Sequence, residues 1–341
     1  MIIDNKLLTI IIPTYNNPNA LRVNILKLVK FLSVSTDISI NIIIADDGSK
    51  SENRKLNEQF FCTLNLPYIE YHYHENLGLE ANELFLIEKV KTKYAMLLGE
   101  DDYLSDKYLN KVFNYLKKYE VGVILSNFFV IDEEGRKTKR ACRNRLHKDK
   151  LYRIFNYKLM FLAHQMSGIV FQIEGLLDYY KANVPHNVYP QLSFIANSIE
   201  KGVNIHITDC PFACTVLKKR RFNYSVDGLI YDLLLNVIAI SKTKKQRRNL
   251  INYFLFRWSG QFCNLSSWKS PIKFWKKVNG YSLLTSRERA KIRITFLISY
   301  FIAPFRIFYR FGILPLIGKA ELKKINYTLE VDFEESIDNR G

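Results

Sequence analysis

Four short runs of strand-forming residues in the first part of the chain, three of them largely apolar, each stop at a group of polar residues, and this repetition strongly constrains the fold. The runs cover residues 7–12, 38–45, 68–73 and 94–98. Short apolar runs closed by turn residues are typical of strands buried on both faces of a parallel sheet. Because such sheets bind ligands at the carboxyl ends of their strands, we expect the polar groups to share one edge.

Helical periodicity separates the runs. Apolar residues recur at three- and four-residue steps after the first run, at Leu21, Ile25, Leu28, Val29 and Leu32. Further helices are predicted over about residues 80–90 and 106–119, and further buried strands over about 121–131 and 203–208. Strand, polar loop and helix thus alternate, as in a doubly wound α/β sheet.

Each strand end supplies a different chemical group. The candidates are Pro13, Thr14 and Tyr15 after the first run, Asp46 and Asp47 after the second, Asn76 after the third, and Glu100, Asp101 and Asp102 after the fourth. An aromatic ring can lie against a base, a carboxylate can accept a hydrogen bond from a base N–H, and acids can hold a metal ion on phosphates. The set therefore suits a nucleotide.

The three consecutive acids are the most demanding part of this set. Adjacent carboxylates repel one another, so a divalent metal ion, an Arg or Lys side chain, or water should lie beside them. A solvated acidic turn after a core strand is the alternative. The sequence has neither a G-x-G-x-x-G after the first run nor a G-x-x-x-x-G-K-[ST] motif, which disfavours a dinucleotide site and a P-loop.

Four segments, in this order and spacing, resemble the family 2 glycosyltransferases with the GT-A fold. They are IIPTYN at 11–16, IADDGS at 44–49, NLG at 76–78 and LLGEDDYL at 97–104. The resemblance implies a Rossmann-like mixed sheet flanked by helices. It also implies transfer of a sugar from a nucleoside diphosphate donor.

The resemblance also implies roles for the candidate residues. Pro13, Thr14 and Tyr15 would line the nucleobase, Asp46 would accept from a base N–H, Asp47 would orient its loop, and Asn76 would join the nucleotide site. Asp101 would meet the ribose and the metal ion, and Asp102 the metal ion. The implied cofactor is a divalent metal, Mn²⁺ or Mg²⁺.

The sequence departs from the family at two places. The usual acidic motif is Asp-x-Asp-Asp, and aligning Asp101 and Asp102 with its last two acids puts Gly99 in the first acidic slot. The two aspartates then carry the metal and ribose roles, with Glu100 as a candidate helper. This form resembles the abequosyltransferase-like sub-group of O-antigen assembly. Residues 79–82 stand where many members carry Ala-Arg-Asn, which removes an Arg on the phosphate side.

The general base is the group that the resemblance leaves open. Many inverting members have a Glu-Asp pair whose acid is the base, and that slot falls on Pro190 and Gln191, where no acid stands. His164 and His186 are the nearest titratable substitutes, because imidazole can act as a base near neutral pH. Each is alternatively a structural or substrate-contacting histidine.

A run of four cations, residues 218–221, follows the last predicted strand. Many family members have a mobile loop here that folds over the diphosphate, so Arg220 and Arg221 are candidates for stabilising charge on the leaving group. A surface basic patch is the alternative.

The charge balance indicates an anionic partner. The 341 residues include 50 Lys and Arg against 33 Asp and Glu, a formal net charge of +17. Nucleic acid, a membrane surface and a phosphorylated substrate all qualify.

Five cysteines without a C-x-x-C pair fit a reducing compartment. Without a signal-peptide pattern or an apolar run long enough to span a bilayer, we expect a cytoplasmic location.

The region from about residue 221 changes in character. It combines short apolar and aromatic segments, such as residues 297–305, with flanking cations. Such helices lie in the membrane interface and are attracted to anionic lipid, whereas a packed helical domain or an oligomer contact is the alternative. The predicted organisation is a GT-A domain over 1–220, a helical membrane-associating module over 221–327 and an acidic tail over 328–341.

Together these features predict a hexosyl- or deoxyhexosyltransferase at the inner face of the cell membrane. It would transfer sugar to a hydroxyl of a lipid-linked glycan in surface polysaccharide assembly, such as O-antigen or capsule, with an inverting mechanism. A catalytically inactive scaffold that binds a nucleotide or glycan is one alternative. A nucleic-acid-binding protein is disfavoured, because the cations are scattered and form no recognisable binding motif.

Overall fold

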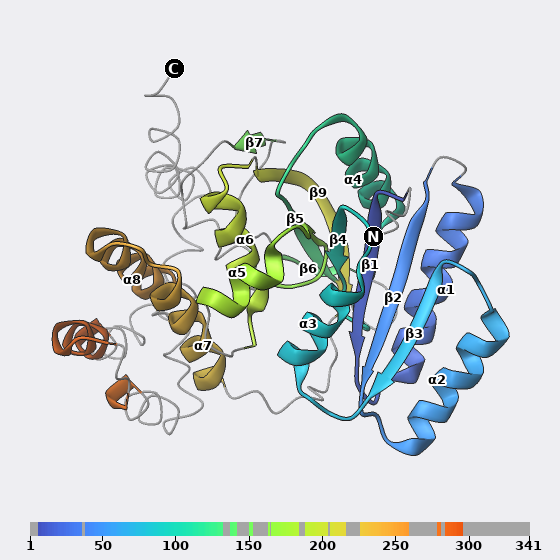
Figure 1. Cartoon of the computed structure of the whole chain (residues 1–341), viewed down its shortest axis with the longest axis horizontal. Helices are drawn as coiled ribbons and strands as arrows, with labels where there is room; N and C mark the ends of the chain where they lie inside the picture. The colour runs from blue at the N-terminus through green and yellow to red at the C-terminus, as the bar shows by residue number, and fades with distance from the viewer. Residues whose placement is uncertain are drawn as a thin grey trace, which may run out of the picture. The chain divides into compact units, whose positions relative to one another are not determined.

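The computed structural model describes residues 6–35, 38–131, 137–141, 150–152, 163, 165–183, 188–203, 205–215, 226–258, 278–280 and 284–295. The elements of its first half are β1 (Leu8–Thr14), α1 (Pro18–Val34), β2 (Ile40–Asp47), α2 (Ser51–Leu64), β3 (Ile69–His74), α3 (Leu79–Lys89), β4 (Tyr94–Leu97), α4 (Asp106–Lys118) and β5 (Val123–Ile131). There follow β6 (Lys137–Ala141), β7 (Lys150–Tyr152), β8 (Ile169–Gln172), α5 (Leu176–Asn183), α6 (Pro190–Glu200), β9 (Ile205–Thr215), α7 (Val226–Ala239) and α8 (Lys244–Trp258) (Figure 1).

The strands form a mixed sheet in the order β3-β2-β1-β4-β8-β5-β9-β7, with β6 paired to β5. The first four strands are parallel to one another, whereas β8 runs antiparallel to both β4 and β5. β9 is parallel to β5. The α/β mixed sheet flanked by helices that the sequence predicts is therefore confirmed.

Two of the predicted strands continue further than their apolar runs. β1 ends at Thr14 and β2 at Asp47, and pairing extends to these ends, where Thr14 lies opposite Asp46 and Asp46 opposite Tyr73. β4 behaves differently, because it ends at Leu97, before the acids. The polar residues of β1 and β2 are therefore strand residues, whereas the acids after β4 lie in a loop.

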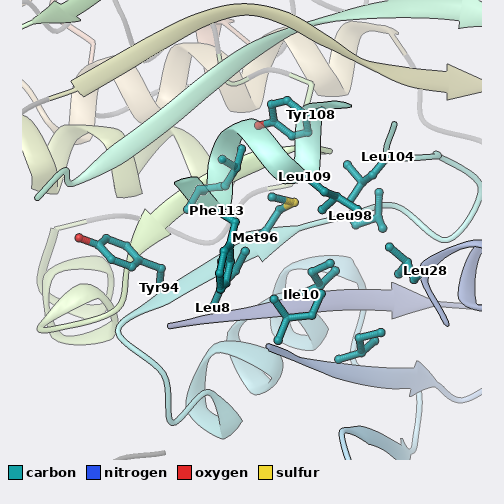
Figure 2. Packing of buried hydrophobic residues seen from close by; sticks show 14 of the residues in the cluster. Leu8, Ile10, Leu28, Tyr94, Met96, Leu98, Leu104, Tyr108, Leu109 and Phe113 are labelled. Atoms are coloured by element: carbon teal, nitrogen blue, oxygen red, sulfur yellow. The ribbon is translucent and has the colours of Figure 1, made fainter. Parts of the chain in front are cut away.

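One hydrophobic core packs α1 and α4 against alternate residues of β1, β2 and β4. Figure 2 shows Leu8 and Ile10 of β1 in this cluster, together with Leu28 of α1 and with Leu109 and Phe113 of α4. Alternate residues of a strand point to the same face, which is why even-numbered positions of β1 gather here. Each such side chain contributes roughly 1.5–3 kcal/mol when fully buried, so the sheet gives the loops at its edge a rigid base.

Helix α4 holds the far end of the acid loop. Its N-cap is Ser105, whose side chain accepts a hydrogen bond from the backbone N–H of Tyr108 at 3.2 Å. The ring of Tyr108 is fully buried in the core. The loop between β4 and α4 is thus anchored at both ends.

Helix α3 contacts β1 and β2 but contributes no residue to this core cluster. The side-chain amide of Asn82 donates to the backbone oxygen of Ala45 at 3.0 Å, which ties the helix to β2. Beside it, Glu83 is fully buried. A helix facing the sheet therefore carries two polar side chains in its buried surface.

Contacts divide the chain into two compact units. The first joins Met1–Ser225 with Asp232–Ile251, and the second joins Val226–Tyr231 with Asn252–Gly341. The sheet and the polar strand ends belong to the first unit. In the parts of the chain that the structure describes, no helix is both long enough and apolar enough to cross a membrane. The apolar and basic segment predicted after residue 296 lies outside the described residues.

Candidate functional site

The polar strand ends meet at one edge of the sheet, as the sequence predicts, because β1 to β4 are parallel and paired there. Hydrogen bonds tie the loops of this edge to one another. The carboxylates accept many of these hydrogen bonds, and each carboxylate has a different set of donors.

The carboxylate of Asp46 is fully buried and serves the protein itself. It accepts hydrogen bonds from Ser49 N at 2.9 Å, Asn57 Nδ2 at 3.1 Å and Tyr71 Oη at 2.7 Å. Burial, and after it the bond to Asp46, raises the pKa of Tyr71, so the phenol keeps its proton and donates. These bonds give Asp46 a structural role, and its contact with a base stays a prediction.

Asp47 joins the end of β2 to the loop after β3. Its two carboxylate oxygens accept from Leu77 N at 2.7 Å and Gly78 N at 3.0 Å, and Asn76 Nδ2 donates to its backbone oxygen at 2.9 Å. Burial raises the pKa of Asp47, while the two N–H groups act in the opposite direction. The loop-orienting role predicted for Asp47 fits these bonds, and Asn76 takes part in the same tie.

The glycine between these loops allows their close approach. Gly48 has a positive φ of 75°, and a Cβ placed on it would lie 2.5 Å from Asn76 N. A side chain is therefore excluded both by the left-handed backbone and by the neighbouring loop.

Asn16 connects the loop after β1 to the loop after β2. Its backbone N–H donates to Ser49 Oγ at 2.7 Å, and its Oδ1 accepts from Lys50 N at 2.8 Å and Asn53 Nδ2 at 3.1 Å. Asn16 adopts a positive φ of 54°, a conformation that asparagine tolerates better than most residues. The loop that carries Tyr15 is therefore held from both sides.

Glu100 turns away from the other acids and binds the loop after β1. Its Oε2 accepts from the hydroxyl of Thr14 and, at 3.0 Å, from Tyr15 N, and Asn17 adds a side-chain hydrogen bond. Burial raises the pKa of Glu100 to about 7, and these hydrogen bonds act in the opposite direction. Glu100 thus connects β1 to the acid loop, and this geometry favours that role over the role of metal helper.

Asp102 is held from the segment that precedes β8. Its Oδ2 accepts from the hydroxyl of Ser167 and, at 3.2 Å, from Gln165 Nε2. Ser167 Oγ also accepts from Gly99 N at 2.9 Å. Asp102 is 6% exposed, whereas Asp101 is only partly buried. The two aspartates therefore differ in how firmly the protein fixes them.

Two aromatic rings remain exposed at the same edge. Tyr15 after β1 and Tyr73 near the end of β3 are each 38% exposed. The guanidinium of Arg54 lies 3.8 Å from the centre of the Tyr73 ring and pairs with Glu58 at 2.6 Å. An exposed ring on a rigid loop can stack with a flat ligand, so Tyr15 keeps the availability that its predicted role requires.

The donor set decides what kind of metal ion the edge could hold. Among the residues that the structure describes, no group of three or more His, Cys, Asp or Glu side chains is placed to hold a metal. With Glu100 turned toward Thr14, the acid loop offers Asp101 and Asp102. Magnesium is commonly held by one or two carboxylates together with substrate phosphates. The set therefore fits a metal ion that binds with a diphosphate.

The predicted base and leaving-group residues, His164, His186, Arg220 and Arg221, lie outside the described residues. The position at which many family members carry the acidic base lies within the described residues. Pro190 and Gln191 begin α6, and the Oε1 atom of Gln191 is buried with no hydrogen-bond partner among the described residues.

Two residues that support the site, Asn24 and Ser167, were not predicted from the sequence. Asn24 of α1 donates to the backbone oxygens of Gly99 at 3.2 Å and Glu100 at 3.4 Å. It lies three residues after Leu21 and four before Leu28, so an amide within an apolar stripe is a signal that could have found it. Ser167 carries no such signal, because it meets Asp102 only through the pairing of β8 with β4.

Comparison with known proteins adds a family to this geometry. Residues 9–175 match the sequence model of Glycosyl transferase family 2. The chain is 25% identical over 134 residues, 39% of its length, to glycosyltransferase GlyA of Streptococcus pneumoniae. It is 27% identical over 124 residues, 36% of its length, to the uncharacterized glycosyltransferase MG060 of Mycoplasma genitalium. The matches span 18% of GlyA and 41% of MG060.

A solved structure shows the same fold. The crystal structure of S. aureus TarS 1–349 in complex with UDP-GlcNAc superposes with a TM-score of 0.57 at 13% identity, covering 90% of this chain and 92% of that chain. The strands and edge loops described above, from β1 to β8, lie within the segment that the family model matches. Residues 9–175 are therefore a Glycosyl transferase family 2 domain, a glycosyltransferase domain on a GT-A-like mixed sheet.

Proposed function

We propose that this protein transfers a sugar from a nucleoside diphosphate donor to a hydroxyl group of a glycan acceptor. The observation that carries the proposal is the edge formed by β1 and β4. There Glu100 fixes the loop with the exposed Tyr15 ring beside the loop with Asp101 and Asp102. An aromatic ring can stack with the base of a nucleoside, and a pair of carboxylates can hold a metal ion on its phosphates. The UDP-GlcNAc bound by the TarS domain supports a nucleotide sugar as donor.

On the donor side, Tyr15 contacts the base while Pro13 and Thr14 support its loop. Thr14 is nearly buried and donates its hydroxyl to Glu100, so its contribution to the base is indirect. Asp46, Asp47 and Asn76 keep the neighbouring loops in place through their hydrogen bonds. The nucleotide thus enters an edge that is already ordered, which lowers the entropy cost of binding.

Asp101 and Asp102 would hold Mn²⁺ or Mg²⁺ when the donor diphosphate binds. A metal ion there would polarise the bond to the leaving phosphate and stabilise the charge that develops on it. The protein residues contribute the geometry. Asp102 is fixed by Ser167 and Gln165, and Asp101 stands next to it with more exposure to solvent. Arg220 and Arg221 are further candidates for the diphosphate.

On the acceptor side, a base must take the proton of the attacking hydroxyl in an inverting displacement. We propose His164 or His186 for this role, since Gln191 at the slot of the missing acid has no basic group. The acceptor is a lipid-linked glycan of surface polysaccharide assembly, such as O-antigen or capsule. The donor sugar is a hexose or deoxyhexose, as in the abequosyltransferase-like sub-group. The cations and apolar residues of 221–327 hold the enzyme at the inner membrane face.

Donor turnover gives a direct test. Purified protein is incubated with Mn²⁺ or Mg²⁺ and a panel of nucleotide sugars that includes UDP-GlcNAc, and release of the nucleoside diphosphate is measured. We expect metal-dependent release that is abolished in Asp102→Ala. The exposed Asp178, on α5, offers a matched control, because Asp178→Ala removes the same group from the surface. Nucleotide binding without turnover of any donor would contradict the proposal and indicate an inactive scaffold.

A further inference from the structure

The segment before β8, residues 165–168, lies beside the acid loop, because β8 begins next to the end of β4. β8 pairs antiparallel with β4, with Ile169 opposite Leu97, and Gly168 N donates to Leu97 O at 2.8 Å. The backbone oxygen of Gly168 also accepts from the hydroxyl of Tyr108, whose ring is buried in the core. β4 and α4 therefore hold the backbone of this segment in place, and its side chains extend from there to the acid loop.

We infer that Ser167, assisted by Gln165, is a positioning residue that sets the orientation of the Asp102 carboxylate for the metal-bound diphosphate. This inference rests on the proposed function, in which Asp102 is a metal ligand. Both residues lie more than sixty positions after Asp102 in the chain, and they act on the same oxygen, Oδ2.

The hydrogen bonds of Ser167 have a defined direction. A serine hydroxyl has one donor and two acceptor sites. Ser167 Oγ accepts from Gly99 N at 2.9 Å, which directs its own proton toward Asp102 Oδ2. Ser167 is fully buried, so the arrangement is shielded from water. A fixed backbone donor thus orients the hydroxyl, and the hydroxyl orients the carboxylate.

Gly99 and Ser167 are complementary in space. A Cβ placed on Gly99 would lie 3.2 Å from Ser167 Oγ and 3.3 Å from Asp102 Oδ2, tighter than an ordinary contact. Gly99 is not among the glycines with positive φ, so its backbone does not itself require glycine. The absence of a side chain at this position makes room for the hydroxyl. The glycine that stands in the slot of an expected acid is therefore part of the support for Asp102.

Groups that orient a metal ligand usually affect metal affinity without touching the metal. Loss of such a partner typically costs 10- to 100-fold in affinity or activity. Ser167 and Gln165 both donate to Oδ2, which restricts rotation of the carboxylate about its Cβ–Cγ bond. Removing the hydroxyl would leave Asp102 in place with one donor fewer on Oδ2, so its carboxylate would turn more easily.

The first experiment measures metal affinity directly. Binding of Mn²⁺ to the full chain in the presence of UDP is titrated by calorimetry or electron paramagnetic resonance. We expect about 10-fold weaker Mn²⁺ binding in Ser167→Ala, with UDP affinity in the absence of metal unchanged. Ser198→Ala is the matched control, because Ser198 is also buried and donates to a backbone oxygen in α6 away from the acid loop. Equal Mn²⁺ affinity in wild type and Ser167→Ala would overturn the inference.

A rescue variant separates positioning from a general loss of packing. In Gly99→Ser combined with Ser167→Ala, a hydroxyl is returned from the other side of the same space. Because the Cβ at position 99 would lie 3.3 Å from Asp102 Oδ2, the new hydroxyl can reach that oxygen. We expect the double variant to recover Mn²⁺ affinity to within about 3-fold of wild type. Recovery of stability without recovery of Mn²⁺ affinity would show that Ser167 only fills space.

Two further variants keep the result interpretable. Gln165 is partly exposed, so Gln165→Ala tests the second donor if Ser167→Ala fails to fold, and we expect a smaller loss of Mn²⁺ affinity. Unchanged Mn²⁺ affinity there would then contradict the inference. Asp102→Ala distinguishes the two levels of the argument. If it leaves Mn²⁺ binding intact, the proposed metal site fails. If it abolishes binding while Ser167→Ala has no effect, only the positioning role fails.

Discussion

Two pairs of adjacent aspartates follow apolar runs in this chain, and the structure uses them differently. Asp46 and Asp47 lie at the end of β2, where their carboxylates accept hydrogen bonds from five protein groups. Asp101 and Asp102 lie in the loop after β4, where Ser167 and Gln165 hold Asp102 and Asp101 is partly exposed. The first pair is fixed within the edge of the sheet, whereas the second pair lies in a loop and includes one partly exposed carboxylate, that of Asp101.

The difference comes from where each strand ends. β2 continues through its aspartates because β1 pairs with it up to Thr14 and β3 pairs with it up to His74. β4 stops at Leu97, so the acids that follow fall in a turn. The same sequence pattern therefore gives a pair within the long strand β2 and a pair in the loop after the short strand β4.

The largest expected effect concerns activity at the second pair. Asp102→Asn keeps the shape of the side chain but removes its charge, and we expect sugar transfer to fall about 1,000-fold. Asp46→Asn is the matched change in the first pair, and there we expect a loss of stability with activity retained in the folded fraction. Transfer is measured as diphosphate release at saturating Mn²⁺. Equal activity losses in the two variants would break the comparison.

The second prediction concerns stability at the first pair. Asp46→Ala leaves Ser49 N, Asn57 Nδ2 and Tyr71 Oη without their acceptor. Because each buried donor without a partner costs about 1–3 kcal/mol, we expect unfolding free energy to fall by roughly 3 kcal/mol or more. Urea denaturation followed by circular dichroism measures the change. A loss below about 0.5 kcal/mol, the size of an ordinary surface change, would show that water replaces the carboxylate.

Alanine substitutions at Gly48 and Gly78 distinguish the cost of a strained backbone from the cost of a clash between the new Cβ and a neighbouring loop. Gly48→Ala combines a positive φ of 75° with a Cβ 2.5 Å from Asn76 N, and we expect a loss of roughly 2–3 kcal/mol. Gly78 has a positive φ of 89° with nothing within 4 Å of its Cβ position, so Gly78→Ala should cost only about 1 kcal/mol. Thermal unfolding of both variants gives the comparison. Equal losses would mean that the loops after β2 and β3 separate easily.

Unlike the hydrogen-bonded aspartates, the buried carboxyl group of Glu83 should make the stability of the protein depend on pH. Both oxygens of Glu83 are buried with no hydrogen-bond partner among the described residues, and burial raises its pKa well above the usual value, with Glu80 adding to the effect. The unfolded chain ionises Glu83 near pH 4.3, whereas the raised pKa lets the folded chain keep this proton to a higher pH. Stability from this group is therefore present below that pH and declines as pH rises toward the folded pKa.

Glu83→Gln removes this dependence. We expect wild type to lose up to about 1.4 kcal/mol per pH unit relative to Glu83→Gln between pH 5 and the folded pKa. Urea titrations at several pH values measure the difference. Parallel pH profiles would show that Glu83 ionises normally in the folded protein.

Much of the sheet could be predicted from the sequence, because buried parallel strands are continuous apolar runs. The four runs locate β1 to β4, and periodicity locates α1 and α4. Helix α2 gives a weaker signal, because Asn57 is its one fully buried residue and Phe60, Phe61 and Leu64 are only partly buried against the core.

The candidate site was predictable in location but less so in the use of each residue. A carboxylate after a strand can face a ligand or bind backbone N–H groups, and only the extent of the strand decides between them. Asp46, predicted to meet a base, thus also accepts three hydrogen bonds from the protein, which its motif does not indicate. Gly99 can be identified as a missing acid from its motif alone, but the group that takes up its space, Ser167, comes from another part of the chain. Local patterns carry no information on such long-range contacts.

The position of β8 in the sheet has a consequence for folding. β8 lies between β4 and β5, although residues 123–152, which include β5 to β7, precede it in sequence. While the chain is synthesised, β4 is an edge strand until residue 172 has emerged, and Asp102 lacks its two donors until then. The loops after β1, β2 and β3 can form early from local segments, whereas the hydrogen bonds to Asp102 are completed late. If the proposed function holds, a chain truncated before β8 should lose affinity for the metal and diphosphate more than affinity for the nucleoside.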